Sequence, residues 1–199
     1  MISDFFLAVL LSIIQGLTEF FPISSSAHLL LPSLLFGAKD FGIVFDISVH
    51  AGTLVAVIYY FKKEILGLLH AWMPWSSNNS KENFSLGLHL IVATLPIVLV
   101  GLLASDLSES RTANINSIAL ANLVFAALLF AAYKSSSQSK SLAELTLFAA
   151  LIIGCFQALA VFPGASRSGM AITGALIIGL NIKDTSRFAF LLSIPTILG

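Results

Sequence analysis

Three long apolar runs limit what this chain can fold into. They cover about residues 42–61, 84–104 and 114–133, and each approaches the ~20 residues that a helix needs to cross a bilayer. Hydrophobic residues make up 57% of the chain and charged residues 10%, with a mean hydropathy of +0.97, whereas soluble domains have about 25% charged residues. The sequence therefore predicts an all-α integral membrane protein that crosses the membrane several times.

Charge and cysteine content exclude other classes of protein. The net charge is zero, which argues against binding to nucleic acid. No basic segment or cleavage site opens the chain, so we expect no signal peptide. Cys155 is the only cysteine and lies in an apolar run. We therefore expect no disulfide and no cysteine metal site, and we predict that Cys155 fills the core.

Two apolar helices are predicted to break inside the membrane. One covers residues 3–20 and ends at Phe21-Pro22, and the other starts near residue 143 and ends at Phe162-Pro163, because proline disfavours helix in the residue before it. The helices that follow are too short to span and are predicted to end at about Leu35 and Leu180. We expect two re-entrant helical hairpins whose broken tips are buried in protein.

The two hairpins resemble each other in sequence. When the two hairpins are aligned with one residue skipped, five positions match. Gln15, Leu17, Phe21, Pro22 and Ser25 of the first hairpin correspond in order to Gln157, Leu159, Phe162, Pro163 and Ser166 of the second. Three spans separate the hairpins, so they should enter from opposite sides of the membrane. This predicts a single membrane domain, residues 1–199, built as an inverted repeat. Repeat one covers about 1–133, a linker about 134–142, and repeat two about 143–199, with its last spans expected to be missing.

Basic residues predict the orientation. If each hairpin returns to its own side, one face carries seven basic residues: Lys62, Lys63, Lys81, Lys134, Lys140, Lys183 and Arg187. The other face carries Lys39 and Arg111. By the positive-inside rule, the first face is cytoplasmic and the N-terminus is periplasmic.

The first hairpin tip combines an acid with neutral polar groups. Gln15 and Glu19 are four residues apart and share a helix face, as do Ser25 and His28 on the second half-helix. An ionised acid near the bilayer centre costs roughly 2.5–3.5 kcal/mol, which indicates a functional residue. A carboxylate beside a phosphate site commonly holds Mg²⁺ or Ca²⁺. We therefore expect Glu19 to bind such a cation, with Gln15 as a second, neutral ligand. His28 could attack phosphorus or act as base for Ser25 or for water, and the sequence leaves these routes open.

The second tip suits an anion. Ser166, Arg167 and Ser168 follow Pro163-Gly164, where a new helix begins with free backbone N–H groups. Open amides, hydroxyls and a guanidinium together favour phosphate. We take these as the candidate phosphate-binding residues: Ser24, Ser26, Gly164, Ser166, Arg167, Ser168 and Thr173.

Structural explanations remain for several of these groups. Arg167 could form only an ion pair with Glu19, and Thr173 could bond its own helix backbone. Three other histidines are predicted to serve in packing or at the membrane interface: His50, His70 and His89.

The two motifs together resemble the undecaprenyl-diphosphate phosphatases linked to bacitracin resistance. The first motif contributes Gln15, Glu19, Pro22, Ser24, Ser25 and His28, and the second Pro163, Gly164, Ser166, Arg167 and Ser168. The resemblance runs the whole length of the chain. It implies a phosphatase of the bacterial inner membrane that uses a divalent cation to convert undecaprenyl diphosphate to the monophosphate, with the site toward the periplasm.

Two departures from the family pattern and one alternative function remain. Ala171 stands where the family's second motif has threonine, and Thr173 lies two residues further on. Family members are also longer. Because broken helices in inverted repeats are typical of transporters, the alternative is a transporter or flippase of a polyprenyl phosphate or another anion. The sequence leaves open the nucleophile, the metal and whether the protein forms a homo-oligomer.

Overall fold

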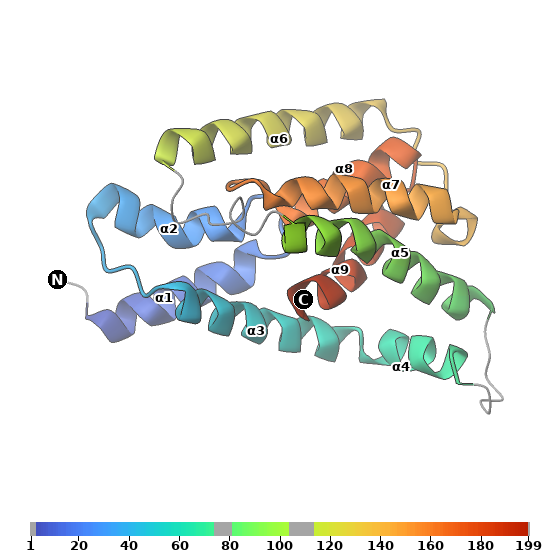
Figure 1. Ribbon diagram of the computed structural model, residues 1–199, viewed down its shortest axis with the longest axis horizontal. Helices are drawn as coiled ribbons and strands as arrows, with labels where there is room; N and C mark the ends of the chain where they lie inside the picture. The colour runs from blue at the N-terminus through green and yellow to red at the C-terminus, as the bar shows by residue number, and fades with distance from the viewer. Residues whose placement is uncertain (1–2, 74–80, 104–113, 199) are drawn as a thin grey trace.

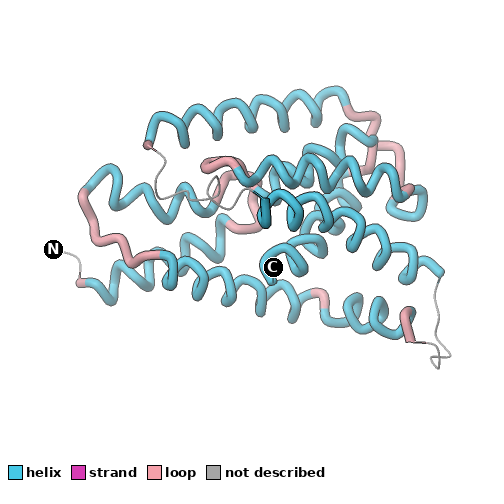
Figure 2. Tube along the Cα trace, viewed as in Figure 1, coloured by secondary structure: helices cyan, strands magenta, loops and turns pink. Residues whose placement is uncertain are grey.

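The computed structural model describes residues 3–73, 81–103 and 114–198, and nearly all of these are helical (Figure 2). Within these ranges the extended structure is limited to a bridge between Lys140 and Leu180. The helices are α1 (Asp4–Thr18), α2 (Ser25–Phe36), α3 (Ile43–Tyr60), α4 (Lys62–Ala71), α5 (Lys81–Leu103), α6 (Ile115–Ser135), α7 (Leu147–Ala158), α8 (Arg167–Ile178) and α9 (Ile182–Leu198), with 3₁₀ turns at Leu142–Glu144 and Leu159–Val161. The predicted all-α class is confirmed.

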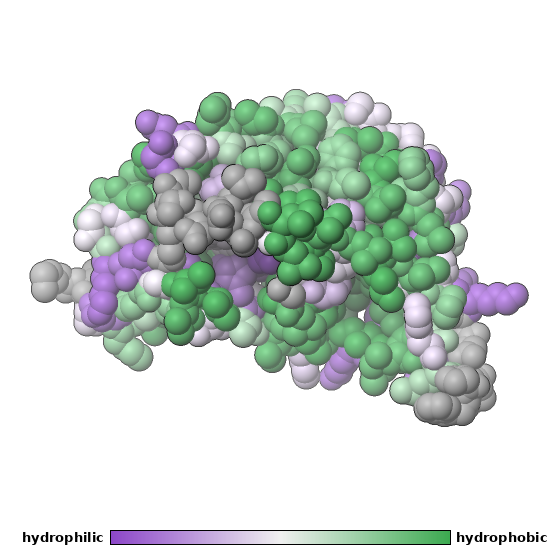
Figure 3. Space-filling view, in the orientation of Figure 1, coloured by the Kyte–Doolittle hydropathy of each residue, from purple (hydrophilic) through white to green (hydrophobic). Residues whose placement is uncertain are grey.

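Among the residues that the structure describes, three helices can cross a membrane by length and composition. They are α3, α5 and α6, with 18, 23 and 21 residues. Hydrophobic side chains cover most of the face shown in Figure 3, and hydrophilic ones gather toward its two ends and in a patch near its middle. A surface this apolar is stable only in contact with lipid or further protein. The protein is therefore an integral membrane protein, as its composition predicted.

The predicted helix breaks are present. Helix α1 ends at Thr18, ahead of Pro22, and α7 continues as a 3₁₀ turn to Val161, ahead of Pro163. Helix α1 packs against α2, and α7 packs against α8. In Figure 1 the α1–α2 pair enters from the left and the α7–α8 pair from the right, and their turns approach each other between them.

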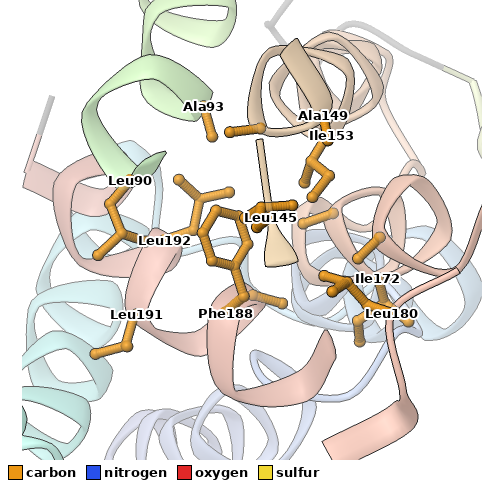
Figure 4. Packing of buried hydrophobic residues seen from close by; sticks show 14 of the residues in the cluster. Leu90, Ala93, Leu145, Ala149, Ile153, Ile172, Leu180, Phe188, Leu191 and Leu192 are labelled. Carbon is orange, nitrogen blue, oxygen red and sulfur yellow. The ribbon is translucent and has the colours of Figure 1, made fainter. Parts of the chain in front are cut away.

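The core lies among α5, α7, α8 and α9. Phe188 of α9 is fully buried there, surrounded by side chains that include Leu192, Ile153 and Leu145 (Figure 4). Helices α5 and α7 approach very closely, since a Cβ added to Gly154 would lie 2.4 Å from the carbonyl oxygen of Ala93.

Cys155 is exposed, so the prediction that it fills the core is wrong. Successive residues of a helix are turned by about 100°, because a turn contains 3.6 residues. Gly154 points at α5, and Cys155 is therefore turned away from that contact. An apolar run in a membrane protein does not by itself distinguish a lipid-facing position from a core position.

The linker between the halves is tied to the start of α9. Lys140 N–H donates to the carbonyl of Gly179 over 3.0 Å, and Asn181 N–H donates to the carbonyl of Lys140 over 2.9 Å. Arg187 Nε donates to Glu64 Oε2 over 2.9 Å and so joins α9 to α4. Lys140, Arg187 and the α3–α4 junction thus belong to one connected end of the molecule. Arg111 lies outside the described residues.

Candidate active site

A small polar cavity lies where the two hairpin turns meet. Its volume is about 60 Å³. Both turns line it: Glu19, Ser24, Ser25 and Ser26 from the first, and Ala160, Ala165, Ser166 and Arg167 from the second. The cavity therefore brings together polar groups that are some 150 residues apart in the chain, as Arg167 Nη2 lies 2.9 Å from Glu19 Oε1 across a separation of 148 positions.

Glu19 is the centre of this cluster. It follows the last residue of α1, and its side chain is only 6% exposed. Its Oε1 accepts from Arg167, and its Oε2 accepts from Gln15 Nε2 over 2.8 Å and from the Ser25 hydroxyl. A buried carboxylate is tolerated when ion pairing and hydrogen bonds replace its hydration. The predicted pairing of Gln15 with Glu19 on one helix face is present.

The start of α8 supplies the other half of the site. Ser166 is the N-cap residue, and its Oγ accepts from Gly169 N–H over 3.1 Å. Arg167 is the first residue of the helix, so it lies beside the positive end of the helix dipole. Arg167 is also partly exposed, at 32% of its side chain. An anion that entered the cavity would meet this guanidinium, the helix end and serine hydroxyls together.

Ser168 joins the two hairpins instead of facing the cavity. Its hydroxyl lies 3.1 Å from the carbonyl oxygen of Phe21 and 3.3 Å from that of Glu19. Gly169 is packed equally closely against the same turn, because a Cβ there would lie 3.1 Å from Pro22 Cβ. The first turn of α8 thus fixes the first hairpin tip beside Arg167.

Ser24 has an unusual backbone conformation. It precedes α2 with φ 58° and ψ 89°, and its side chain makes no capping hydrogen bond. A residue with a Cβ pays roughly 1–2 kcal/mol for a left-handed conformation. Its carbonyl accepts from His28 Nδ1 over 2.8 Å. Its side chain lines the cavity.

Besides Gln15 and Ser168, three predicted site residues lie outside the cavity lining. His28 is half-buried and directs Nδ1 to the Ser24 carbonyl on its own helix. Gly164 has φ 95°, and a Cβ there would lie 2.6 Å from the Ile118 carbonyl oxygen, so its place is against α6. Thr173 is fully buried and donates to Gly169 O over 2.7 Å, the backbone bond that the sequence offered as an alternative.

His50 is a site residue that the sequence interpretation did not select. It lies in α3, and its Nε2 is 3.3 Å from Glu19 Oε2 while its Nδ1 is 2.7 Å from the carbonyl of Asp46. The expectation that it serves only in packing or at the interface does not describe these contacts. Its position in the middle of a predicted span was the available signal, since ionisable residues within spans usually have a function.

In the described part of the chain, two buried amide side chains have an atom without a hydrogen-bond partner: Gln15 Oε1 and Gln157 Nε2. A buried polar atom without a partner is costly, which points to a ligand or water at that position. Gln157 lines a cavity of about 10 Å³ behind the ion pair, shared with Glu19, Arg167, Ser193 and Thr196. These two glutamines are one of the five residue pairs that the sequence comparison of the hairpins matched.

The protein's own donor atoms at this site can hold a cation only if a bound ligand supplies further donor atoms. No cluster of three or more histidine, cysteine, aspartate or glutamate side chains suitable for a metal occurs in the part of the chain that the structure describes. Glu19 supplies one carboxylate, and Gln15 Oε1 supplies a buried oxygen that lacks a hydrogen-bond partner. Mg²⁺ is commonly bound by one or two carboxylates together with substrate phosphates and waters, so this donor set fits a cation that binds with a phosphate.

The fold and the site define a class of protein. It is an all-helical membrane protein in which the turns of two helical hairpins enclose a serine-lined cavity with one Glu–Arg pair. The chain belongs to the bacitracin resistance protein BacA family, which matches residues 8–199. The resemblance inferred from the two motifs is confirmed.

Curated relatives match nearly the whole chain. An undecaprenyl-diphosphatase of Saccharophagus degradans is 50% identical over 194 residues, which are 98% of this chain and 73% of that protein. Those of Alcanivorax borkumensis and Teredinibacter turnerae are each 46% identical, over 98% of this chain and 74% of their own lengths.

Proposed function

We propose that this protein is an undecaprenyl-diphosphatase. It hydrolyses undecaprenyl diphosphate to undecaprenyl phosphate and phosphate, which recycles the lipid carrier of cell-wall synthesis and confers resistance to bacitracin. Membership of the BacA family and the names of its relatives support this activity.

The observation that carries the proposal is the meeting of Arg167 with Glu19 at a cavity lined by serines. The guanidinium and the N-terminal end of α8 attract the terminal phosphate. Arg167 donates to Glu19 through Nη2, and a guanidinium has five N–H donors. Its other donors can therefore bind a phosphate oxygen while the ion pair persists.

Ser25 is the nucleophile that the geometry supports best. Its hydroxyl already donates to Glu19 Oε2. We propose that Ser25 Oγ, oriented by its hydrogen bond to Glu19, attacks the terminal phosphorus while its proton passes to a phosphate oxygen of the substrate, and that the P–O bond to the departing undecaprenyl phosphate breaks. Water then attacks the phosphoserine, which releases phosphate and returns the proton to Ser25. His28 contacts Ser24 and lies outside the cavity lining, so we assign it the role of holding the strained turn at Ser24.

We propose that Glu19 and Gln15 hold a divalent cation, Mg²⁺ or Ca²⁺, beside the substrate. When bound, the cation supplies positive charge that offsets the diphosphate. The partnerless Gln15 Oε1 supports this assignment.

We infer an inverted repeat, with about 1–133 as repeat one, about 134–142 as linker and about 143–199 as repeat two. The Phe-Pro breaks and the matched glutamines at 15 and 157 support it. We place the protein in the bacterial inner membrane with the N-terminus and the site toward the periplasm, on the distribution of basic residues.

Substitution of Arg167 tests the function. In purified protein, Arg167→Ala should lower the release of phosphate from undecaprenyl diphosphate by at least a hundredfold, because the phosphate loses its bidentate donor. EDTA should abolish the release, and Mg²⁺ or Ca²⁺ should restore it.

Arg187→Ala is the matched control. Arg187 also pairs with a glutamate over 2.9 Å, but near the start of α9 and outside the serine-lined cavity, so this variant should keep its phosphatase rate. An unchanged rate in Arg167→Ala would contradict the phosphate-binding role. Vesicles that translocate the lipid without hydrolysing it would favour the transporter.

A further inference from the structure

Besides Glu19 and Gln15, a third side chain at the site has the geometry of a metal ligand. We propose that His50 Nε2 and Glu19 Oε2 bind the same divalent cation. The inference rests on the proposed function for the presence of that cation, and it adds a nitrogen ligand from a different helix.

The orientation of His50 is fixed by a backbone group. Its Nδ1 lies 2.7 Å from the carbonyl oxygen of Asp46, one turn earlier in α3. A carbonyl oxygen only accepts hydrogen bonds, so Nδ1 carries the hydrogen. In the neutral imidazole, Nε2 then has a free lone pair. Proteins hold metal-binding histidines in this way, with one ring N–H donated to a carbonyl or carboxylate and the other nitrogen left for the metal.

The free nitrogen faces a second donor atom. Nε2 lies 3.3 Å from Glu19 Oε2, and both side chains are largely buried, at 16% and 6% exposure. Two lone pairs at this distance repel each other unless a proton or a cation lies between them. A separation of 3.3 Å is short enough for one cation to contact both atoms at metal–ligand distances of ~2.0–2.2 Å.

The environment of Gln15 favours a cation, and not a proton, between His50 Nε2 and Glu19 Oε2. Its Oε1 is buried without a partner, while its Nε2 donates to the same Glu19 Oε2. A proton shared by His50 and Glu19 would leave that amide oxygen unsatisfied. A cation that also reached Gln15 Oε1 would give this atom a partner, and phosphate oxygens or water would complete the coordination.

A nitrogen ligand also changes the preferred metal. Mg²⁺ and Ca²⁺ favour all-oxygen sites, whereas imidazole favours transition metals, and Mn²⁺ accepts both kinds of donor. We therefore expect Mn²⁺ to bind the protein more tightly than Mg²⁺ does.

Electron spin-echo spectroscopy of Mn²⁺ bound to the full chain in detergent tests the proposal directly. The wild type should show hyperfine coupling from a coordinated imidazole nitrogen. In His50→Gln this coupling should disappear, and the affinity for Mn²⁺ should fall at least tenfold. His89→Gln is the control: His89 is a buried histidine of another span, and this variant should retain the coupling. Circular dichroism establishes that each variant is folded, and His50→Asn serves as a second variant.

Two results would overturn the assignment. One is a wild-type protein in which Mn²⁺ binds through Glu19 but shows no nitrogen coupling. That result would mean that His50 and Glu19 share a proton and not the metal. The other is coupling that persists in both His50 variants. The proposed function fails separately: nitrogen coupling that depends on His50, in a protein that does not hydrolyse undecaprenyl diphosphate, supports the ligand and contradicts the phosphatase.

Discussion

Glu19 shows how a single buried carboxylate can organise residues from four helices, α1, α2, α3 and α8. Gln15 and Ser25 contact it from the first hairpin, His50 from α3 and Arg167 from the start of α8. An unpaired charge is very unfavourable at this buried position, because it has lost its hydration. The need to pair the carboxylate of Glu19 therefore holds each partner in place. The geometry that stabilises Glu19 also places Arg167 and the serines around one cavity.

Thr173 gives a test at the scale of one hydroxyl. Because its hydroxyl donates to Gly169 O inside α8 and the residue is fully buried, Thr173→Val should leave the rate of phosphate release within about twofold of wild type. Loss of this local bond should have little effect on folding, since the Gly169 carbonyl is an acceptor within a helix.

The comparison with Thr173→Ser separates the two roles of this residue. A tenfold lower rate in Thr173→Val, restored in Thr173→Ser, would mean that the hydroxyl reaches the phosphate. That result would support its place among the phosphate-binding residues predicted from the sequence.

At the scale of elements, the contact between α5 and α7 depends on a glycine. Gly154→Ala would put a Cβ 2.4 Å from the Ala93 carbonyl oxygen. This is a backbone atom that no rotamer change can remove, so we expect a loss of about 1–3 kcal/mol in the free energy of unfolding. Thermal unfolding in detergent, followed by circular dichroism, measures the change.

Gly52→Ala is the matched control for this contact. Gly52 lies within α3, and nothing lies within 4 Å of an added Cβ. Alanine is the better helix former by about 1 kcal/mol, so this variant should unfold at the wild-type temperature or above it. Equal destabilisation by the two substitutions would contradict the close contact between α5 and α7.

The helix starts show which local rules the sequence conveys. Ser166 caps α8 through its side chain, as serine after a break is expected to do. Ser24 occupies the same position before α2 but caps nothing and has a left-handed backbone. Sequence rules describe the first case because capping is local. The second depends on the contacts around the cavity.

At the scale of the whole molecule, the orientation in the membrane can be measured by labelling. In a Cys155→Ser background, Lys39→Cys should react with a membrane-impermeant maleimide in intact spheroplasts. Ser139→Cys, in the exposed linker, should react only after permeabilisation. The reason is the excess of lysine and arginine on the linker side, which is retained in the cytoplasm. The reverse pattern would place the N-terminus in the cytoplasm.

The sequence by itself determined the helical membrane class, the two breaks and most of the polar cluster. Apolar runs of spanning length, proline after phenylalanine and the spacing of Gln15 and Glu19 are local signals, and each depends on residues a few positions apart. Arg167 could be assigned to an anion for the same reason, since the start of a helix is visible in the sequence.

The tertiary structure decided which of these groups meet. His50 joins Glu19 from α3, Ser168 binds the opposite hairpin, and Thr173 and Gly164 turn away from the cavity toward their own packing contacts. These outcomes depend on how helices rotate and approach across long separations in the chain. A uniformly apolar sequence leaves that rotation undetermined, because lipid and protein interior favour the same side chains.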